Sequence, residues 1–155
     1  MKRIILALTF ALGFAQAEWI EDEIVTSFEQ HTVKQSYKIG EEVETSFLSK
    51  RETVVLYTCN LTDGSQQFVI SALDRFATQP KALEFIVDGE PRDLPLVPIS
   101  EGGTTVDSRV AVKLADELNE VDEIRVRLLF YTGRTTVFIV SPKGIKETEA
   151  YKACN

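Results

Sequence analysis

The chain has few of the residues from which catalytic and metal sites are usually built. Its 155 residues include one histidine, two cysteines, one tryptophan and one methionine. A histidine-rich metal site needs several imidazoles, and His31 is the only one here. A serine nucleophile usually needs a positioned histidine base, and the sequence contains no G-x-S-x-G elbow. We therefore predict no metal, no cofactor and no catalytic residues, with His31 as an exposed polar residue.

Positive charge and long apolar runs are also scarce. Lysine and arginine total 17 against 24 acidic residues, which gives a formal net charge of -7. Nonspecific nucleic-acid binding needs a basic face that displaces counterions from phosphates, so an acidic chain is a poor candidate for it. The one long apolar run, from Ile4 to Phe14, is shorter than the roughly 20 residues that span a bilayer. We predict no nucleic-acid partner and no integral membrane span.

The same apolar run has the features of an export signal. Lys2 and Arg3 precede it, and the A-x-A sequence that ends at Ala17 follows it. We predict a signal peptide over residues 1–17, cleaved between Ala17 and Glu18, in preference to a buried N-terminal helix. Cleavage removes two basic residues and no acid, so the net charge changes from -7 to about -9. The predicted location is the periplasm or the extracellular space.

The two cysteines, Cys59 and Cys154, both lie in the predicted mature chain. An exported protein enters an oxidising compartment, where two cysteines allow a single internal pairing. We predict a Cys59–Cys154 disulfide that closes a loop of about 95 residues. Two free thiols or a redox pair are the alternatives, and the absence of a C-x-x-C motif disfavours redox chemistry.

Alternating apolar residues and frequent turn signals predict a single β-rich domain over residues 18–155. We expect an antiparallel β-sandwich or barrel-like fold with one or two short helices, because the chain has no βαβ rhythm. The last helix would carry Cys154, so the disulfide would staple the C-terminal segment to a strand. The expected strands are 53–59, 67–72, 82–88, 94–99, 104–112, 124–131 and 135–140, and the expected helices are 113–118 and 145–154.

The first part of the mature chain is less regular. Residues 18–32 mix acidic and apolar side chains and fit either a helix or a loosely docked N-terminal arm. Residues 33–47 alternate loosely and predict one or two short strands, with Gly40 at a turn.

Two charged clusters are candidate sites. Asp88, Glu90 and Asp93 surround a turn, where a solvated turn is favoured over an acid–base pair. A secreted carboxylate-dependent hydrolase is therefore an alternative function. Arg125 and Arg127 share the outward face of a predicted strand, and Arg134 follows in the next hairpin. Cross-strand ion pairs are the simpler interpretation of these arginines, and a patch that binds an acidic partner is the other.

Residues 53–155 resemble the VasI-type exported proteins associated with type VI secretion. The matching features are a strand with a cysteine, a D-G turn, a V-R strand after a short helix, and an F-x-V segment leading to a C-terminal cysteine. They fall on Cys59, Asp88, Gly89, Arg125 to Arg127, Phe138, Gly144, Ile145 and Cys154. Two positions depart from the pattern, with Thr58 in place of arginine and Asn155 in place of a tryptophan-containing tail.

The resemblance implies a periplasmic accessory protein without a known catalytic apparatus. The related invasion-associated locus B-like exported β-domains are an alternative family. We expect a non-catalytic protein that binds another envelope or secreted protein, and a secreted inhibitor or adhesin-like module is the alternative for the arginine patch.

Overall fold

The computed structural model describes residues 18–26, 31–45, 52–73, 81–98, 103–106 and 108–155. These residues form ten strands, two α-helices and one short 3₁₀ helix. The strands are β1 (Ile20–Thr26), β2 (His31–Thr45), β3 (Glu52–Asn60), β4 (Gln66–Leu73), β5 (Ala82–Val87), β6 (Glu90–Arg92), β7 (Val97–Pro98), β8 (Gly103–Val106), β9 (Ile124–Leu129) and β10 (Thr135–Val140). The helices are α1 (Ser108–Leu118), η1 (Ile145–Glu147) and α2 (Glu149–Cys154).

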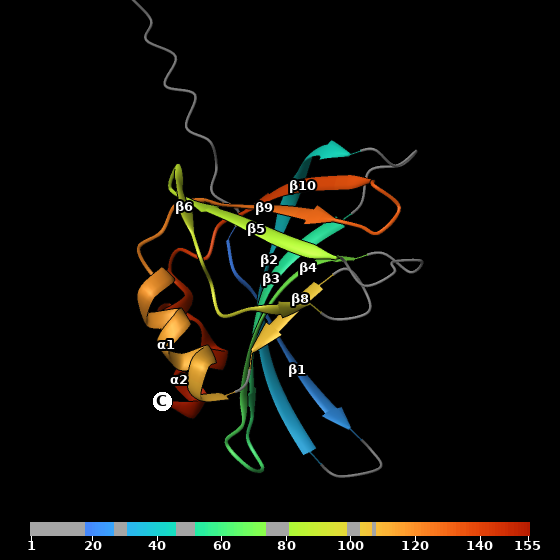
Figure 1. The fold of residues 1–155 in the computed structure, drawn as a ribbon. Helices are drawn as coiled ribbons and strands as arrows, with labels where there is room; N and C mark the ends of the chain where they lie inside the picture. The colour runs from blue at the N-terminus through green and yellow to red at the C-terminus, as the bar shows by residue number, and fades with distance from the viewer. Residues whose placement is uncertain (1–17, 27–30, 46–51, 74–80, 99–102, 107) are drawn as a thin grey trace, which may run out of the picture.

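All strand pairs are antiparallel and belong to one strongly bent sheet. The strand order is β6-β5-β9-β10-β2-β3-β4-β8-β7, and β1 also pairs with β2. Figure 1 shows β5, β9 and β10 crossing β2, β3 and β4 at a steep angle, with α1 and α2 to one side. The structure therefore confirms the mainly β, sandwich-like fold with two short helices.

Strand β2 joins the two halves of the sheet, and Gly40 lies where it passes from one half to the other. Residues 31–37 of β2 pair with β1, whereas Glu41 and the residues after it pair with β10. A Cβ atom at Gly40 would lie 2.5 Å from the Ile139 carbonyl oxygen, from Thr53 Oγ1 and from Val140 Cγ1. The sequence predicts Gly40 at a turn, and this prediction is wrong. Gly40 lies inside one strand, where the two halves of the sheet approach too closely for a side chain.

The core lies between the two halves of the sheet and the helices. The predicted alternation in β9 is confirmed, with Ile124, Val126 and Leu128 buried and the two arginines between them exposed. Helix α1 starts at Ser108, five residues earlier than predicted, and covers the core with Leu114 and Leu118. The largest fully buried side chains are Tyr57, Phe68, Phe138, Ile70, Leu114, Leu118, Ile124, Leu128 and Ile145.

The C-terminal segment is fixed by hydrogen bonds and by the predicted disulfide. Thr148 separates η1 from α2, and its Oγ1 accepts the Tyr151 amide at 3.2 Å as an N-cap. Ser36 of β2 accepts the Ala150 amide at 3.1 Å, and Glu21 of β1 accepts the Glu149 amide at 3.2 Å. These contacts satisfy amides at the helix start, which have no partner within the helix.

The Cys59–Cys154 disulfide then joins the end of α2 to β3, with 5.9 Å between the two Cα atoms.

The start of the described chain is a strand rather than a helix or a loosely docked arm. Residues Ile20–Thr26 pair along β2, from Ile20 opposite Tyr37 to Thr26 opposite His31. Just before this strand, the Trp19 indole N–H donates to the Lys143 carbonyl at 2.9 Å. The pairing partner lies on the next strand, so local sequence preference does not reveal it.

Tyr57, in the core below α2, provides a test of this packing at alkaline pH. Its hydroxyl donates to the Gln66 side chain, and burial raises its pKa from 10.0 to about 12. An unfolded tyrosine loses its proton near pH 10, so between pH 10 and about 12 the unfolded state binds fewer protons. We expect the free energy of unfolding to fall by about 2–3 kcal/mol as pH rises through this window.

Denaturant titrations of the wild type and of Tyr57→Phe at several pH values check this prediction. The phenylalanine variant should lack this component of the alkaline destabilisation. The ultraviolet absorbance of tyrosinate should also show an ionisation near pH 12 in the wild type that is absent from Tyr57→Phe. Equal alkaline losses in the two proteins would contradict the prediction.

Candidate binding surface

An apolar row crosses the outward face of β1, β2, β3 and β4. Ile20 lies opposite Tyr37, Tyr37 opposite Leu56, and Leu56 opposite Val69, so one residue of each strand contributes to the row. Ile39 lies two positions further along β2, on the same face. We call this set of residues, with Ile24 and Val54, the apolar sheet face.

The apolar sheet face is accessible to solvent. Ile20, Ile24 and Ile39 are 41%, 43% and 54% exposed, and the other members of the row are partly exposed. Figure 1 shows both helices on the other side of β2, β3 and β4. Exposed apolar side chains that lie next to one another mark interaction sites more often than isolated ones do.

The charges on this face have one sign. At the outward positions of β1 to β4 whose side chains the structure describes, the charged residues are Asp22 and Glu41. Asp22 accepts a hydrogen bond from the Gln35 side chain at 3.2 Å, which keeps its carboxylate at the surface of the sheet. The face therefore combines apolar contact area with negative charge.

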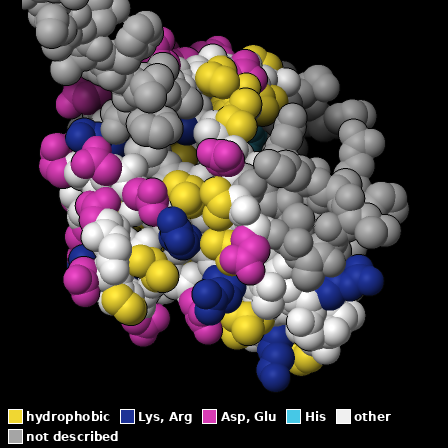
Figure 2. Space-filling model, turned by 90° about the horizontal axis from the view of Figure 1, so that it is seen from above, with side chains coloured by type: hydrophobic (Ala, Val, Ile, Leu, Met, Phe, Trp, Pro, Cys, Tyr) yellow, Lys and Arg dark blue, Asp and Glu magenta, His cyan; other side chains and the backbone are white. Residues whose placement is uncertain are grey.

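The predicted arginine patch lies on the other half of the sheet. Arg127 Nη1 lies 2.9 Å from Glu84 Oε2 on the neighbouring strand, and Arg125 Nη2 lies 3.5 Å from Glu123 Oε1. All four side chains are about half exposed. Figure 2 shows side chains of both charges interleaved with hydrophobic ones on this side of the molecule.

The three arginines do not form one isolated basic patch. Arg134 is also exposed but belongs to the turn between β9 and β10, beyond the strand that carries the other two. The pairing of Arg127 with Glu84 is the cross-strand arrangement that the simpler interpretation predicts. Exposed ion pairs of this kind contribute about 0–1 kcal/mol to the free energy of unfolding. The arginines can therefore exchange these carboxylates for other partners.

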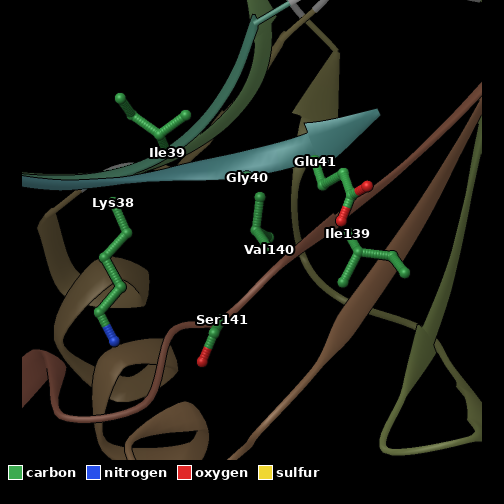
Figure 3. A pocket seen from close by; sticks show the side chains of 7 residues that line it. All are labelled: Lys38, Ile39, Gly40, Glu41, Ile139, Val140 and Ser141. Atoms are coloured by element: carbon green, nitrogen blue, oxygen red, sulfur yellow. The ribbon is translucent and has the colours of Figure 1, made fainter. Parts of the chain in front are cut away.

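A notch opens along the edge of β2 between the start of β1 and the end of β10. Its volume is about 290 Å³, and it is lined by Lys38, Ile39, Gly40, Glu41, Ile139, Val140 and Ser141. It arises because β1 pairs with β2 up to Tyr37, whereas β10 pairs with β2 from Glu41 onward. Figure 3 shows Lys38 and Ser141 extending to the same side of β2, with Ile39 on the other side.

Lys38 is the most unusual charged residue of the notch, because it is only 6% exposed. Its Nζ donates to the Lys143 carbonyl at 2.7 Å and lies 5.0 Å from the centre of the Trp19 ring. Burial, and then the nearby charge of Lys143, hold the pKa of Lys38 below its usual value. The sequence does not predict that Lys38 is buried, because nothing in the local pattern of residues distinguishes it from an exposed lysine.

The predicted carboxylate cluster at the β5–β6 turn is exposed. Asp88, Glu90 and Asp93 all lie at the surface, and Asp88 Oδ1 accepts the Glu123 amide at 2.9 Å. This contact links the turn to the start of β9, as the solvated-turn interpretation predicts. Within the described ranges, no group of three histidine, cysteine or acidic side chains has the geometry to hold a metal ion.

His31 lies at the start of β2, partly buried, with Nδ1 3.4 Å from the Asn60 side-chain nitrogen. It is therefore less exposed than the sequence analysis predicts, because β2 and β3 bring Asn60 against it.

Comparison with known proteins supplies no relative for this chain. No family model, no curated protein and no solved structure matches it. Among the described residues, no helix has the length and apolar character needed to cross a membrane.

Proposed function

We propose that this protein is an exported, non-catalytic accessory protein of the bacterial envelope that binds another envelope or secreted protein through its apolar sheet face. The observation that carries the proposal is the row of Ile20, Tyr37, Leu56 and Val69 across four strands on a face that the helices leave uncovered. An apolar row of this kind provides the desolvated centre that a protein interface needs.

Two features support export. The Cys59–Cys154 disulfide suits an oxidising compartment. Trp19, two residues after the predicted cleavage position, is already held by the Lys143 carbonyl, so the mature chain would begin immediately before its first tertiary contact. The proposed location is the periplasm or the extracellular space.

The charges of the sheet face indicate the chemistry of the partner. Asp22 and Glu41 flank the apolar row, and the whole chain carries a formal charge of -7. The proposed partner therefore presents an apolar patch with lysine or arginine residues around it, since complementary charge steers association and excludes acidic competitors. The resemblance to VasI-type proteins makes type VI secretion components the first candidates for this partner.

Site-specific photocrosslinking tests the proposal at the sheet face. We would introduce benzoyl-phenylalanine at Tyr37, in the apolar row, and at Tyr131, which is 80% exposed in the β9–β10 turn. In cells that produce the protein, the Tyr37 position should give a discrete adduct that mass spectrometry identifies as one envelope protein. The Tyr131 position should give no such adduct.

A matched pair of lysine substitutions on β1 then tests the face itself. Ile20→Lys places a charge in the apolar row, whereas Val25→Lys lies on the opposite face of the same strand, where Val25 is 65% exposed. We expect Ile20→Lys to reduce the yield of the Tyr37 adduct about ten-fold or more, and Val25→Lys to leave it unchanged. Equal adducts from Tyr37 and Tyr131, or equal effects of the two substitutions, would overturn the proposal.

A further inference from the structure

We propose that the notch beside Lys38 is a binding site for a carboxylate group. The proposal goes beyond the function of the sheet face, because it assigns a separate site with its own ligand chemistry. It rests on a buried ammonium group, a buried hydroxyl group and an opening of about 290 Å³ beside them.

The ammonium group of Lys38 has unused capacity to donate hydrogen bonds. An ammonium has three N–H donors, and the structure gives one of them to the Lys143 carbonyl, 2.7 Å away. Within the described part of the chain, no carboxylate forms an ion pair with Lys38, although it is 94% buried. A buried charge without a paired charge is costly, and a bound anion would lower that cost.

Ser141 supplies a second polar group to the lining of the notch. Its Oγ is buried and has no hydrogen-bond partner among the described residues, and Figure 3 shows the side chain on the same side of β2 as Lys38. A hydroxyl group donates one hydrogen bond, which suits one oxygen of a carboxylate while Lys38 takes the other.

The remaining walls limit what the ligand can be. Val140 and Ile139 provide apolar contact, and Gly40 forms part of the wall. Glu41 also lines the opening, and Figure 3 shows it extending toward Ile139 rather than toward Lys38. A single carboxylate with a short apolar chain fits these walls better than a multiply charged phosphate, which Glu41 would repel.

The carboxylate could belong to a free small acid or to the C-terminus of a polypeptide. These sources share the chemistry that Lys38 and Ser141 recognise, so the experiment includes both. Butyrate represents the first source and N-acetyl-Ala-Ala the second, and butyramide and N-acetyl-Ala-Ala-amide are their uncharged controls.

Trp19 provides a direct readout because it is the only tryptophan of the chain. Its ring lies 5.0 Å from Lys38 Nζ, so an anion bound to Lys38 changes the field at the indole. We would titrate the full mature protein with each of the four compounds and follow tryptophan fluorescence and the heat of binding. We expect saturable binding of at least one of the two acids and none of either amide.

Two variants and one control assign the binding to the notch. Lys38→Met keeps the length of the side chain and removes its charge, and we expect affinity to fall about 10- to 100-fold. Ser141→Ala should weaken binding about 3- to 10-fold and keeps the test decisive if Lys38→Met does not fold. Lys34→Met is the control, since Lys34 lies on the same strand but pairs with Glu149 at 3.4 Å.

Three results would overturn the proposal. The first is the absence of saturable binding by either acid, and the second is equal binding of the acids and the amides. The third is unchanged affinity in both Lys38→Met and Ser141→Ala. None of these results affects photocrosslinking at Tyr37, so the failure of this site and the failure of the sheet-face proposal are distinguishable.

Discussion

Removal of the Cys59–Cys154 disulfide is expected to lower the free energy of unfolding by about 4–5 kcal/mol. The disulfide closes a loop with a sequence separation of 95, and a closed loop of that length restricts the unfolded chain by about this amount in the chain-entropy model. It also holds α2 against β3, where the six-residue helix is too short to be stable alone. We therefore expect α2 to lose hydrogen-exchange protection before the sheet does.

Denaturant unfolding of the oxidised protein, the reduced protein and Cys59→Ala/Cys154→Ala measures the effect. The alanine variant also loses buried sulfur atoms, since Cys59 is fully buried, so the reduced wild type isolates the contribution of the covalent link. Thr148→Ala removes the N-cap of α2 and leaves the disulfide, and it should cost only about 1 kcal/mol. A loss below about 1 kcal/mol on reduction would show that α2 and the sheet hold together without the disulfide.

Substitution of Gly40 by valine is the second change with a large expected effect, a loss of about 3 kcal/mol or more. A Cβ atom alone would lie 2.5 Å from Thr53 Oγ1, Val140 Cγ1 and the Ile139 carbonyl oxygen. The last of these is backbone and cannot rotate away, so relief of the clash requires β2 and β10 to separate. Such a separation would open the bend that joins the two halves of the sheet.

Thermal and denaturant unfolding of Gly40→Val, Gly40→Ala and Gly64→Ala separates crowding from backbone strain. Gly64 has a φ of 70° but no heavy atom within 4 Å of its Cβ position, so its substitution should cost about 1–2 kcal/mol through strain alone. The two Gly40 variants should be less stable than Gly64→Ala, and valine should be worse than alanine. Gly40→Ala as stable as the wild type would mean that the strands pass one another with more room than the structure indicates.

Hydrophobic alternation and turn chemistry were sufficient to predict most of the sheet. The strands β3, β4, β5, β9 and β10 lie close to the expected ranges. In β3, β4 and β9 buried residues alternate with more exposed ones, whereas β10 is an apolar run that is mostly buried. The sequence also predicts the Asp88–Gly89 turn, but it does not predict where the strand after the turn begins. Both residues have positive φ, which turns the chain tightly, so the return strand is Glu90–Arg92 directly after the turn rather than residues 94–99.

Two helix boundaries were wrong for reasons that are visible in the sequence. The sequence predicts a strand over residues 104–112, but strand β8 ends at Val106 and α1 begins at Ser108. The buried face of α1 consists of residues at helical spacing, namely Ala111, Leu114, Ala115 and Leu118. The two leucines alone indicate a short helix, and the two alanines extend the apolar face toward the start of α1. The last helix is interrupted at Thr148, whose side chain caps α2, as threonine commonly does at a helix start.

The candidate sites depended far more on tertiary structure. The apolar sheet face requires the register that places Ile20, Tyr37 and Leu56 opposite one another, and each of these residues alone is an ordinary strand residue. The notch requires β1 and β10 to end at different points along one edge of β2. Strand register and strand order are non-local, so neither follows from local propensity.

The sequence by itself determined three properties of this protein. The fold is mainly β, Cys59 pairs with Cys154, and the side chains of Arg125 and Arg127 point outward. The first follows from alternating apolar residues and turn signals, the second from the presence of only two cysteines, and the third from the two-residue period of a strand. The tertiary structure decided that Gly40 lies in a continuous strand, that residues 20–26 are a strand, and that Lys38 is buried. Each of these depends on atoms that are distant in the chain and are brought within contact only when the sheet bends. Burial and close approach are properties of the packed structure, and a local pattern does not contain them.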